Sequence, residues 1–177
     1  LGTALEIDEA TRRSLELTRT IRGGSREGSL LSVLDRTVTP MGSRLLYDWL
    51  ANPLTDVREI DCRLDAVEEL VGDSPLRNEA RELLRGVYDV ERLLARVITG
   101  RCSPRDLSFI ARTLGHLPKL KAKLAGRESE LLCRLEAELD LCPEIRAKLE
   151  AAFVSECPLS PRDGGFVRDG FSQELDS

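Results

Sequence analysis

The glycine-rich segment at residues 23–28 is the first place where this sequence could bind a nucleotide. Gly23 and Gly28 have the spacing of the glycines in a phosphate-binding loop, Gly-x4-Gly-Lys-Ser/Thr. However, Ser29 stands where that loop requires lysine, and Ser25 stands where a dinucleotide fingerprint requires its middle glycine. The segment is therefore predicted to reverse the chain. The alternative left open is an anion held by free N–H groups where the next helix begins.

The only histidine, His116, has no partners for metal binding or catalysis in the sequence. A single histidine excludes a multi-histidine metal cluster, and no nucleophile motif accompanies it. We interpret it as an exposed or helix-end residue beside Pro118. Acidic groups on predicted helices are interpreted as solvated faces that pair with basic neighbours; these are Glu68, Glu69, Glu136, Glu138 and Asp140.

The cysteines are odd in number and none belongs to a Cys-x-x-Cys pair. This pattern is typical of reduced thiols in a cytosol, with no zinc site and no disulfide framework. The residues are Cys62, Cys102, Cys133, Cys142 and Cys157. The sequence thus predicts no catalytic, cofactor-binding or metal-ligating residue.

Basic residues are concentrated in two places, but neither pattern is typical of a nucleic-acid site. No aromatic residues alternate with them for base stacking, and acidic residues lie nearby. The net charge of -5 also argues against a free-standing nucleic-acid binder. We expect weak or absent DNA binding at physiological salt. The two groups are Arg12, Arg13, Arg19, Arg22 and Arg26, and Lys119, Lys121, Lys123 and Arg127.

The composition indicates an all-α protein. Of its 177 residues, 41% are apolar and only 4% are aromatic, which suits packed amphipathic helices better than a sandwich or barrel. The length fits one domain. No apolar run approaches the roughly 18 residues that span a membrane, and no signal-like start is present, so we expect a soluble cytoplasmic protein.

Helix signals follow one another along the chain. Asp8 can cap a helix that extends to about Thr20, and a short apolar helix occupies residues 29–34. Thr39 can cap the next helix, and Pro40 occupies the first position of that helix. Behind them, one predicted buried face consists of Leu45, Leu46, Trp49 and Leu50.

The middle of the sequence has the clearest periodicity. Asp56 begins a helix that ends at Gly72, and two more helices end at Gly86 and Gly100. The helix that begins at Asp56 repeats apolar residues every three or four positions, which indicates one apolar face. Its apolar residues are Val57, Ile60, Leu64, Val67 and Leu70.

The longest candidate helix begins at Ser103, and Pro118 predicts a kink or break near Leu117. Two further helices follow, through residues 131–139 and 143–153. We expect an irregular multi-helix bundle over residues 8–157, preceded by the end of a linker at 1–7. A loop or small hairpin around Asp163 at 158–171 and the start of a truncated helix at 172–177 complete the prediction.

Several runs of the sequence, in order, resemble the core domain of the MutS family of DNA mismatch repair proteins. The longest contains Arg36-Thr37-Val38-Thr39-Pro40-Met41-Gly42-Ser43-Arg44. The similar segments are residues 11–17, 28–46, Trp49, Leu50, Pro53, Leu54, 63–70, 89–96 and 168–171. Together they extend over nearly the whole chain.

The resemblance implies a core or lever segment that joins a connector domain to long lever helices, a DNA clamp and a dimeric ATPase. ATP, Mg²⁺, mismatched DNA, a MutL-type partner and homodimer formation would then belong to the full-length protein. The family's mismatch-reading Phe-x-Glu motif does not occur here, and the family's ATPase residues are also absent, so the segment itself is not expected to be an enzyme. A MutS-like protein of recombination control and a generic helical adaptor remain alternatives.

Overall fold

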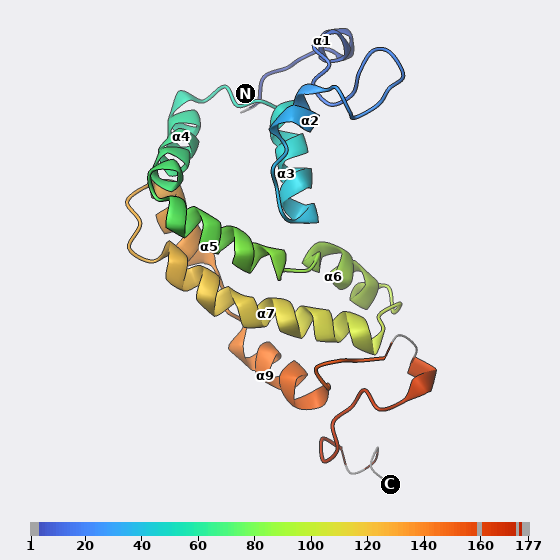
Figure 1. The fold of residues 1–177 in the computed structure, drawn as a ribbon. Coiled ribbons are helices and arrows are strands. Elements are labelled where there is room, and N and C mark those ends of the chain that lie inside the picture. Colours follow the sequence, from blue (N-terminus) through green and yellow to red (C-terminus); the bar gives the residue numbers. More distant parts are fainter. Residues whose placement is uncertain (1–3, 159–160, 173, 175–177) are drawn as a thin grey trace. The chain divides into compact units, whose positions relative to one another are not determined.

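The computed structural model describes residues 4–158, 161–172 and 174, and over these residues its regular elements are helices (Figure 1). The only strand-like features there are two isolated antiparallel bridges, Ala4 with Leu54 and Phe153 with Val167. The all-α prediction is therefore confirmed. The helices are α1 Glu9–Ser14, α2 Leu30–Leu34, α3 Pro40–Ala51, α4 Val57–Gly72, α5 Ser74–Arg85, α6 Val90–Ile98, α7 Pro104–Leu124, α8 Glu130–Glu138 and α9 Pro143–Ala152, with the short 3-10 helix η1 at Pro161–Asp163.

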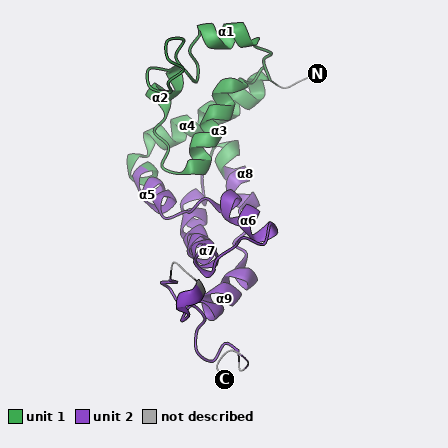
Figure 2. Ribbon diagram, turned by 90° about the vertical axis from the view of Figure 1, so that its right-hand side faces the viewer, with its two compact units in different colours: residues 1–77, 128–132 green, residues 78–127, 133–177 purple. Residues whose placement is uncertain are grey.

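The chain divides into two compact units (Figure 2). The first unit contains residues 1–77 and 128–132, and the second contains residues 78–127 and 133–177. The divisions fall inside α5 and α8, so each of these helices contributes residues to both units.

The first helix is shorter than its sequence predicted. Asp8 caps α1 by accepting from the Thr11 N–H at 2.8 Å, but the helix ends at Ser14 and not near Thr20. Glu16 has a φ of 47°, a left-handed conformation that stops a helix. The carbonyl of Glu16 instead accepts from the Leu30 N–H at 3.1 Å, so a tertiary hydrogen bond replaces the helical one.

The α3 helix begins as predicted but does not bury the predicted face. The Thr39 hydroxyl accepts from the Gly42 N–H at 3.0 Å, and Pro40 occupies the first turn. Leu45 is 51% exposed and Trp49 is 39% exposed, while Leu46 and Leu50 are half-buried. The prediction of a buried face is wrong, because the amphipathic pattern marks an apolar face without supplying anything to cover it.

The α4 helix is held to the segment before α8 by a carboxylate. Asp56 caps α4 by accepting from the Arg58 N–H at 2.9 Å. The Glu69 side chain accepts from the backbone N–H groups of Glu128 and Ser129, the latter at 2.9 Å. Glu69 was interpreted from the sequence as part of a solvated face, but it satisfies donors at the start of another helix.

The α7 helix organises the second unit. Ser103 and Asp106 form a capping box, in which the Ser103 N–H donates to Asp106 at 2.9 Å. The helix buries Ile110 and Ala111 and contacts both α6 and α9.

Pro118 does not break the α7 helix, so of the predicted kink or break near Leu117 the break is wrong. The helix continues from Pro104 to Leu124 without interruption (Figure 1). Contacts on the carboxyl-terminal side of the proline hold that end, since Lys121 donates to the Leu139 carbonyl at 3.0 Å and Lys123 pairs with Glu79. These contacts help to hold the turns that follow the proline.

The segment that follows α9 folds back on that helix's end. Val154 N–H donates to the Phe166 carbonyl at 3.1 Å, and Arg168 N–H donates to the Ala152 carbonyl at 2.9 Å. The predicted loop or hairpin is thus a wide return with η1 at Pro161–Asp163, not a tight turn at Asp163. Most of the predicted final helix at 172–177 lies outside the described residues.

Candidate functional site

The N–H groups at the start of α2 are already occupied. Leu30 and Leu31 donate to the carbonyls of Glu16 and Leu17 at 3.1 and 2.9 Å, and Ser32 N–H donates to the Ser29 hydroxyl. Ser29 is completely buried. No donor of this turn is left for an anion, so the geometry supports the predicted chain reversal and contradicts the anion alternative.

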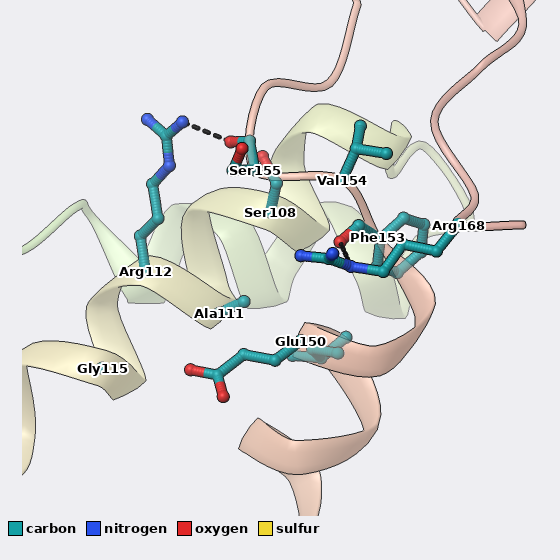
Figure 3. A pocket seen from close by; sticks show the side chains of 10 residues that line it. Ser108, Ala111, Arg112, Gly115, Glu150, Phe153, Val154, Ser155 and Arg168 are labelled. Carbon is teal, nitrogen blue, oxygen red and sulfur yellow. Dashed lines mark hydrogen bonds between the residues drawn. The ribbon is translucent and has the colours of Figure 1, made fainter. Parts of the chain in front are cut away.

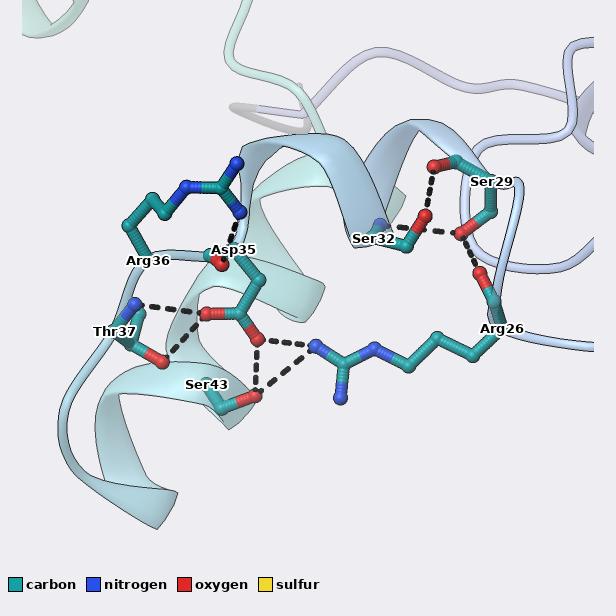
Figure 4. Close-up of polar contacts among 7 residues, drawn as sticks. All are labelled: Arg26, Ser29, Ser32, Asp35, Arg36, Thr37 and Ser43. Atoms are coloured by element: carbon teal, nitrogen blue, oxygen red, sulfur yellow. Dashed lines mark hydrogen bonds and ion pairs between the residues drawn. The ribbon is translucent and has the colours of Figure 1, made fainter.

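The best-defined polar cluster in the first unit surrounds Asp35, between α2 and α3 (Figure 4). One carboxylate oxygen accepts from the Thr37 N–H at 2.9 Å and the Thr37 hydroxyl at 2.6 Å. The other accepts from the Ser43 hydroxyl at 2.8 Å and pairs with Arg26. The cluster therefore connects the loop before α2 to the first turn of α3.

The hydrogen bonds define what Asp35 can do chemically. Those donated by the Thr37 hydroxyl and N–H, together with Ser43 and Arg26, hold the pKa of Asp35 far below its usual range. A carboxylate that remains ionised and accepts on both oxygens is a poor general base. We conclude that Asp35 positions the chain. The Asp35-x-Thr37 spacing of an Asx turn is the sequence signal that could have identified it.

A second polar cluster closes the amino-terminal end of α7. Asp106 accepts from Ser103 and from Arg96, the latter at 2.7 Å. Burial by itself raises the pKa of Asp106, but the Ser103 and Arg96 hydrogen bonds outweigh it and leave the pKa below its usual value. Burial and the charge of Asp106 raise the pKa of the nearby Cys102 thiol, which makes that cysteine a poor nucleophile.

A small pocket of about 160 Å³ lies where α7 meets α9 in the second unit (Figure 3). Ala111 and Phe153 contribute apolar walls. Two guanidinium groups line the pocket, and both donate hydrogen bonds to backbone carbonyls. Arg112 donates to the Ser155 carbonyl, and Arg168 donates to the Phe153 carbonyl at 2.7 Å. The pocket is a packing gap whose arginines hold the returning chain in place.

His116 lies inside α7 and not at a helix end, because the helix continues beyond Pro118. It is half-buried and its ring lies against Gly86, where an added Cβ would be 2.5 Å from the ring. The prediction of an exposed or helix-end histidine is therefore wrong.

Many of the basic residues interact within their own unit. Arg12 donates to the carbonyls of Ile7 and Ala51, and Arg26 pairs with Asp35. In the second group, Lys121 lies 3.8 Å from Glu136 and Lys123 pairs with Glu79. These four cations therefore have partners within the chain, and the expected weak affinity for DNA stays a prediction.

All five cysteines are free thiols. Within residues 4–158, 161–172 and 174, no group of three His, Cys, Asp or Glu side chains is arranged to hold a metal ion. Among the helices of that same part of the chain, none is long and apolar enough to cross a membrane.

Comparison with known proteins gives a consistent family. The family model for MutS domain III matches residues 10–175. The DNA mismatch repair protein MutS of Rhodopirellula baltica is 61% identical over 173 residues, which is 98% of this chain and 19% of the relative. The proteins of the same name from Symbiobacterium thermophilum and Myxococcus xanthus are 45% and 46% identical over 175 residues, or 99% of this chain.

The chain spans about a fifth of the length of these curated relatives. The match nevertheless extends through both helical units, from α1 to the chain that returns after α9. This chain therefore belongs to the MutS family of DNA mismatch repair proteins, as a segment that corresponds to MutS domain III.

Proposed function

We propose that this segment is the core of a MutS-type mismatch repair ATPase, in which it mechanically links the part that grips DNA to the part that hydrolyses ATP. The observation that carries the proposal is the match to MutS domain III over residues 10–175. The relatives are called DNA mismatch repair proteins, which favours this role over recombination control or a generic adaptor.

The polar clusters support a mechanical role. Asp35, Glu69 and Asp106 each tie segments together through hydrogen bonds to backbone or side-chain donors. Charged groups bonded in this way fix the start of a helix or the path of a loop. Packed helices with fixed junctions have discrete arrangements, so displacement at one end can bias the other end.

In this proposal, other parts of the full-length protein bind and hydrolyse ATP. The residues of this segment do not fit ATP and Mg²⁺, because Ser29 replaces the phosphate-binding lysine and the α2 N–H groups are occupied. We propose that mismatched DNA, a MutL-type partner and a second protomer are also bound through the full-length protein. The segment itself is then not an enzyme.

The experiment replaces Gly42 by alanine in the full-length protein. The added Cβ would lie 2.9 Å from the Thr39 hydroxyl oxygen that caps α3, so the cap must shift. Trp49→Ala is a second variant, since it removes the ring beneath the Arg63 guanidinium, 3.9 Å away. We expect mismatch binding and ATP hydrolysis to persist while ATP-driven release from mismatched DNA becomes several-fold slower.

Glu27→Gln is the control, because this exposed side chain lies in the loop before α2. Release kinetics, ATP hydrolysis and the thermal unfolding midpoint are measured on all variants. Unchanged release kinetics together with unchanged stability in both test variants would contradict the proposed role.

A further inference from the structure

The α8 helix does not begin in the way that α2, α3 and α7 begin. In those helices the preceding residue, Ser29, Thr39 or Ser103, accepts a hydrogen bond from the N–H three positions later. Ser129 is a good capping residue and stands in the same position before α8. Its hydroxyl nevertheless has no hydrogen-bond partner, although the residue is only 8% exposed. Such a hydroxyl raises the free energy of the arrangement, because it has left water without gaining a bond.

A carboxylate from α4 takes the place of the local cap. The Glu69 side chain accepts from the Glu128 N–H at 3.1 Å and from the Ser129 N–H at 2.9 Å. Its negative charge also lies at the positive end of the α8 dipole, which stabilises the contact. A further ion pair between the two helices, Arg58 with Glu130 at 3.9 Å, is exposed and contributes little. Glu69 therefore dominates the polar tie between α4 and the start of α8.

The two caps differ in what they require. The Ser129 hydroxyl can accept from the Leu132 N–H whenever α8 is formed, because the two residues are only three positions apart. The Glu69 bonds join residues 59 and 60 positions apart, so they exist only while α4 lies against the segment before α8. Loss of the Glu69 contact thus leaves α8 with a second cap that the closed arrangement does not use.

We propose that Glu69 and Ser129 are alternative caps of α8 and together form a reversible latch between α4 and α8. With Glu69 engaged, α4 is held at the start of α8 and the Ser129 hydroxyl stays unbonded. When Glu69 withdraws, that hydroxyl accepts from the Leu132 N–H, so α8 keeps its first turn while α4 is released. The bond gained in the open state lowers the cost of opening. The latch goes beyond the linking role proposed above, since it gives the segment a defined point of release.

The first test measures opening of the latch by amide hydrogen exchange in the full-length protein, read at single residues by mass spectrometry. The Glu128 N–H is the probe, because it bonds Glu69 in the closed latch and its intrinsic exchange rate does not depend on residue 129. Ser129→Ala removes the cap of the open state, so the Glu128 N–H should exchange about 5-fold more slowly. A hydroxyl that merely stabilised the fold would give faster exchange when removed. Faster or unchanged exchange would therefore overturn the proposal.

Ser103→Ala is the matched control for this substitution. The Ser103 hydroxyl is an ordinary serine cap that accepts from the Asp106 N–H at 3.2 Å. Its removal should speed exchange of the Asp106 N–H about 5-fold, the opposite direction from the effect of Ser129→Ala at Glu128.

The second test separates the open-state cap from simple relief of the unbonded hydroxyl in the closed state. Glu69→Ala opens the latch in the full-length protein, and Glu68→Ala, at the exposed neighbouring position, is its control. In the Glu69→Ala background, Ser129→Ala should speed exchange of the Leu132 N–H about 5-fold, because Ser129 then caps α8. In the native and Glu68→Ala backgrounds it should change that rate less than about 2-fold. An equal effect in all three backgrounds would overturn the proposal.

A second variant keeps this test usable if Glu69→Ala prevents folding, as judged by circular dichroism. Glu69→Gln then replaces it, because glutamine removes the charge from the contact but keeps the length of the side chain. The same comparison of Leu132 exchange with and without Ser129→Ala applies, with Glu68→Gln as control.

Discussion

The α4 and α7 helices have similar apolar periodicity but use it in opposite ways. The α7 helix buries Ile110 and Ala111 within the second unit, where it contacts α6 and α9. In α4, Leu64 and Val67 are more than half exposed, and the buried positions belong to Cys62 and Ala66. Periodicity therefore specifies which face of a helix is apolar, while neighbouring elements decide whether that face is covered.

The difference extends to how the two helices are held. The α7 helix begins with a buried capping box, Ser103 and Asp106, reinforced by Arg96. The α4 helix begins at the Asp56 cap and is tied by the Glu69 carboxylate, while its buried side chains, Cys62 and Ala66, are small. These contacts leave Leu64 and Val67 exposed.

The largest expected difference between the helices comes from truncating apolar side chains in this chain. Ile110→Ala leaves a cavity in a buried site, so the free energy of unfolding should fall by about 3 kcal/mol. Val67→Ala removes an exposed side chain and should change it by less than about 0.5 kcal/mol. Urea denaturation measures both values. Equal losses would show that Val67 is covered within this chain.

A smaller effect is expected from adding a methyl group beside each helix. Gly86→Ala places a Cβ 2.5 Å from the His116 ring and should cost about 2 kcal/mol of unfolding free energy. Gly72→Ala, at the end of α4, meets nothing within 4 Å and should be neutral or slightly stabilising. Thermal and urea unfolding report both changes.

A double-mutant cycle tests the cause of that effect. In a His116→Ala background the cost of Gly86→Ala should fall below about 0.5 kcal/mol, because the clashing ring is gone. If the cost persists in that background, the conflict lies with the backbone and not with the histidine.

The smallest expected effect is the acid sensitivity of the α7 cap. The folded-state pKa of Asp106 lies below the unfolded value near 3.8. Its stabilisation is therefore complete above the unfolded pKa and is lost as the pH falls through the folded pKa. Asp106→Asn should lower the unfolding free energy by about 1 kcal/mol at pH 7 and weaken its decline as the pH falls below the unfolded pKa. An unchanged pH profile in the variant would exclude Asp106 as a source of the dependence.

The local signals in the sequence located most helix starts. Asp8, Ser29, Thr39, Asp56 and Ser103 all accept hydrogen bonds from the first turns of the helices they precede. Capping depends on residues within three positions of each other, so the sequence contains the whole interaction. The ends of the helices were harder to predict from the sequence. The α1 helix stops earlier than predicted, and α7 continues through Pro118.

The polar clusters were only partly predictable. The Asp35 and Thr37 contact is local, but Arg26 and Ser43 reach the same carboxylate from either side along the chain. The Glu69 contacts join residues 59 and 60 positions apart, and no local pattern marks them. Such contacts exist only when the fold brings their partners together.

By itself, the sequence determined the helical class, the caps and the apolar faces, because these depend on residue type and on separations of a few positions. It also contained enough runs of residues similar to the MutS core domain, in the same order, to indicate the MutS family. Only the tertiary structure decided that Glu16 ends α1, that Pro118 stays inside α7 and that large apolar side chains of α4 are exposed. Each of these outcomes depends on which distant groups supply a hydrogen bond or remove a surface from water, and spacing along the chain does not contain that information.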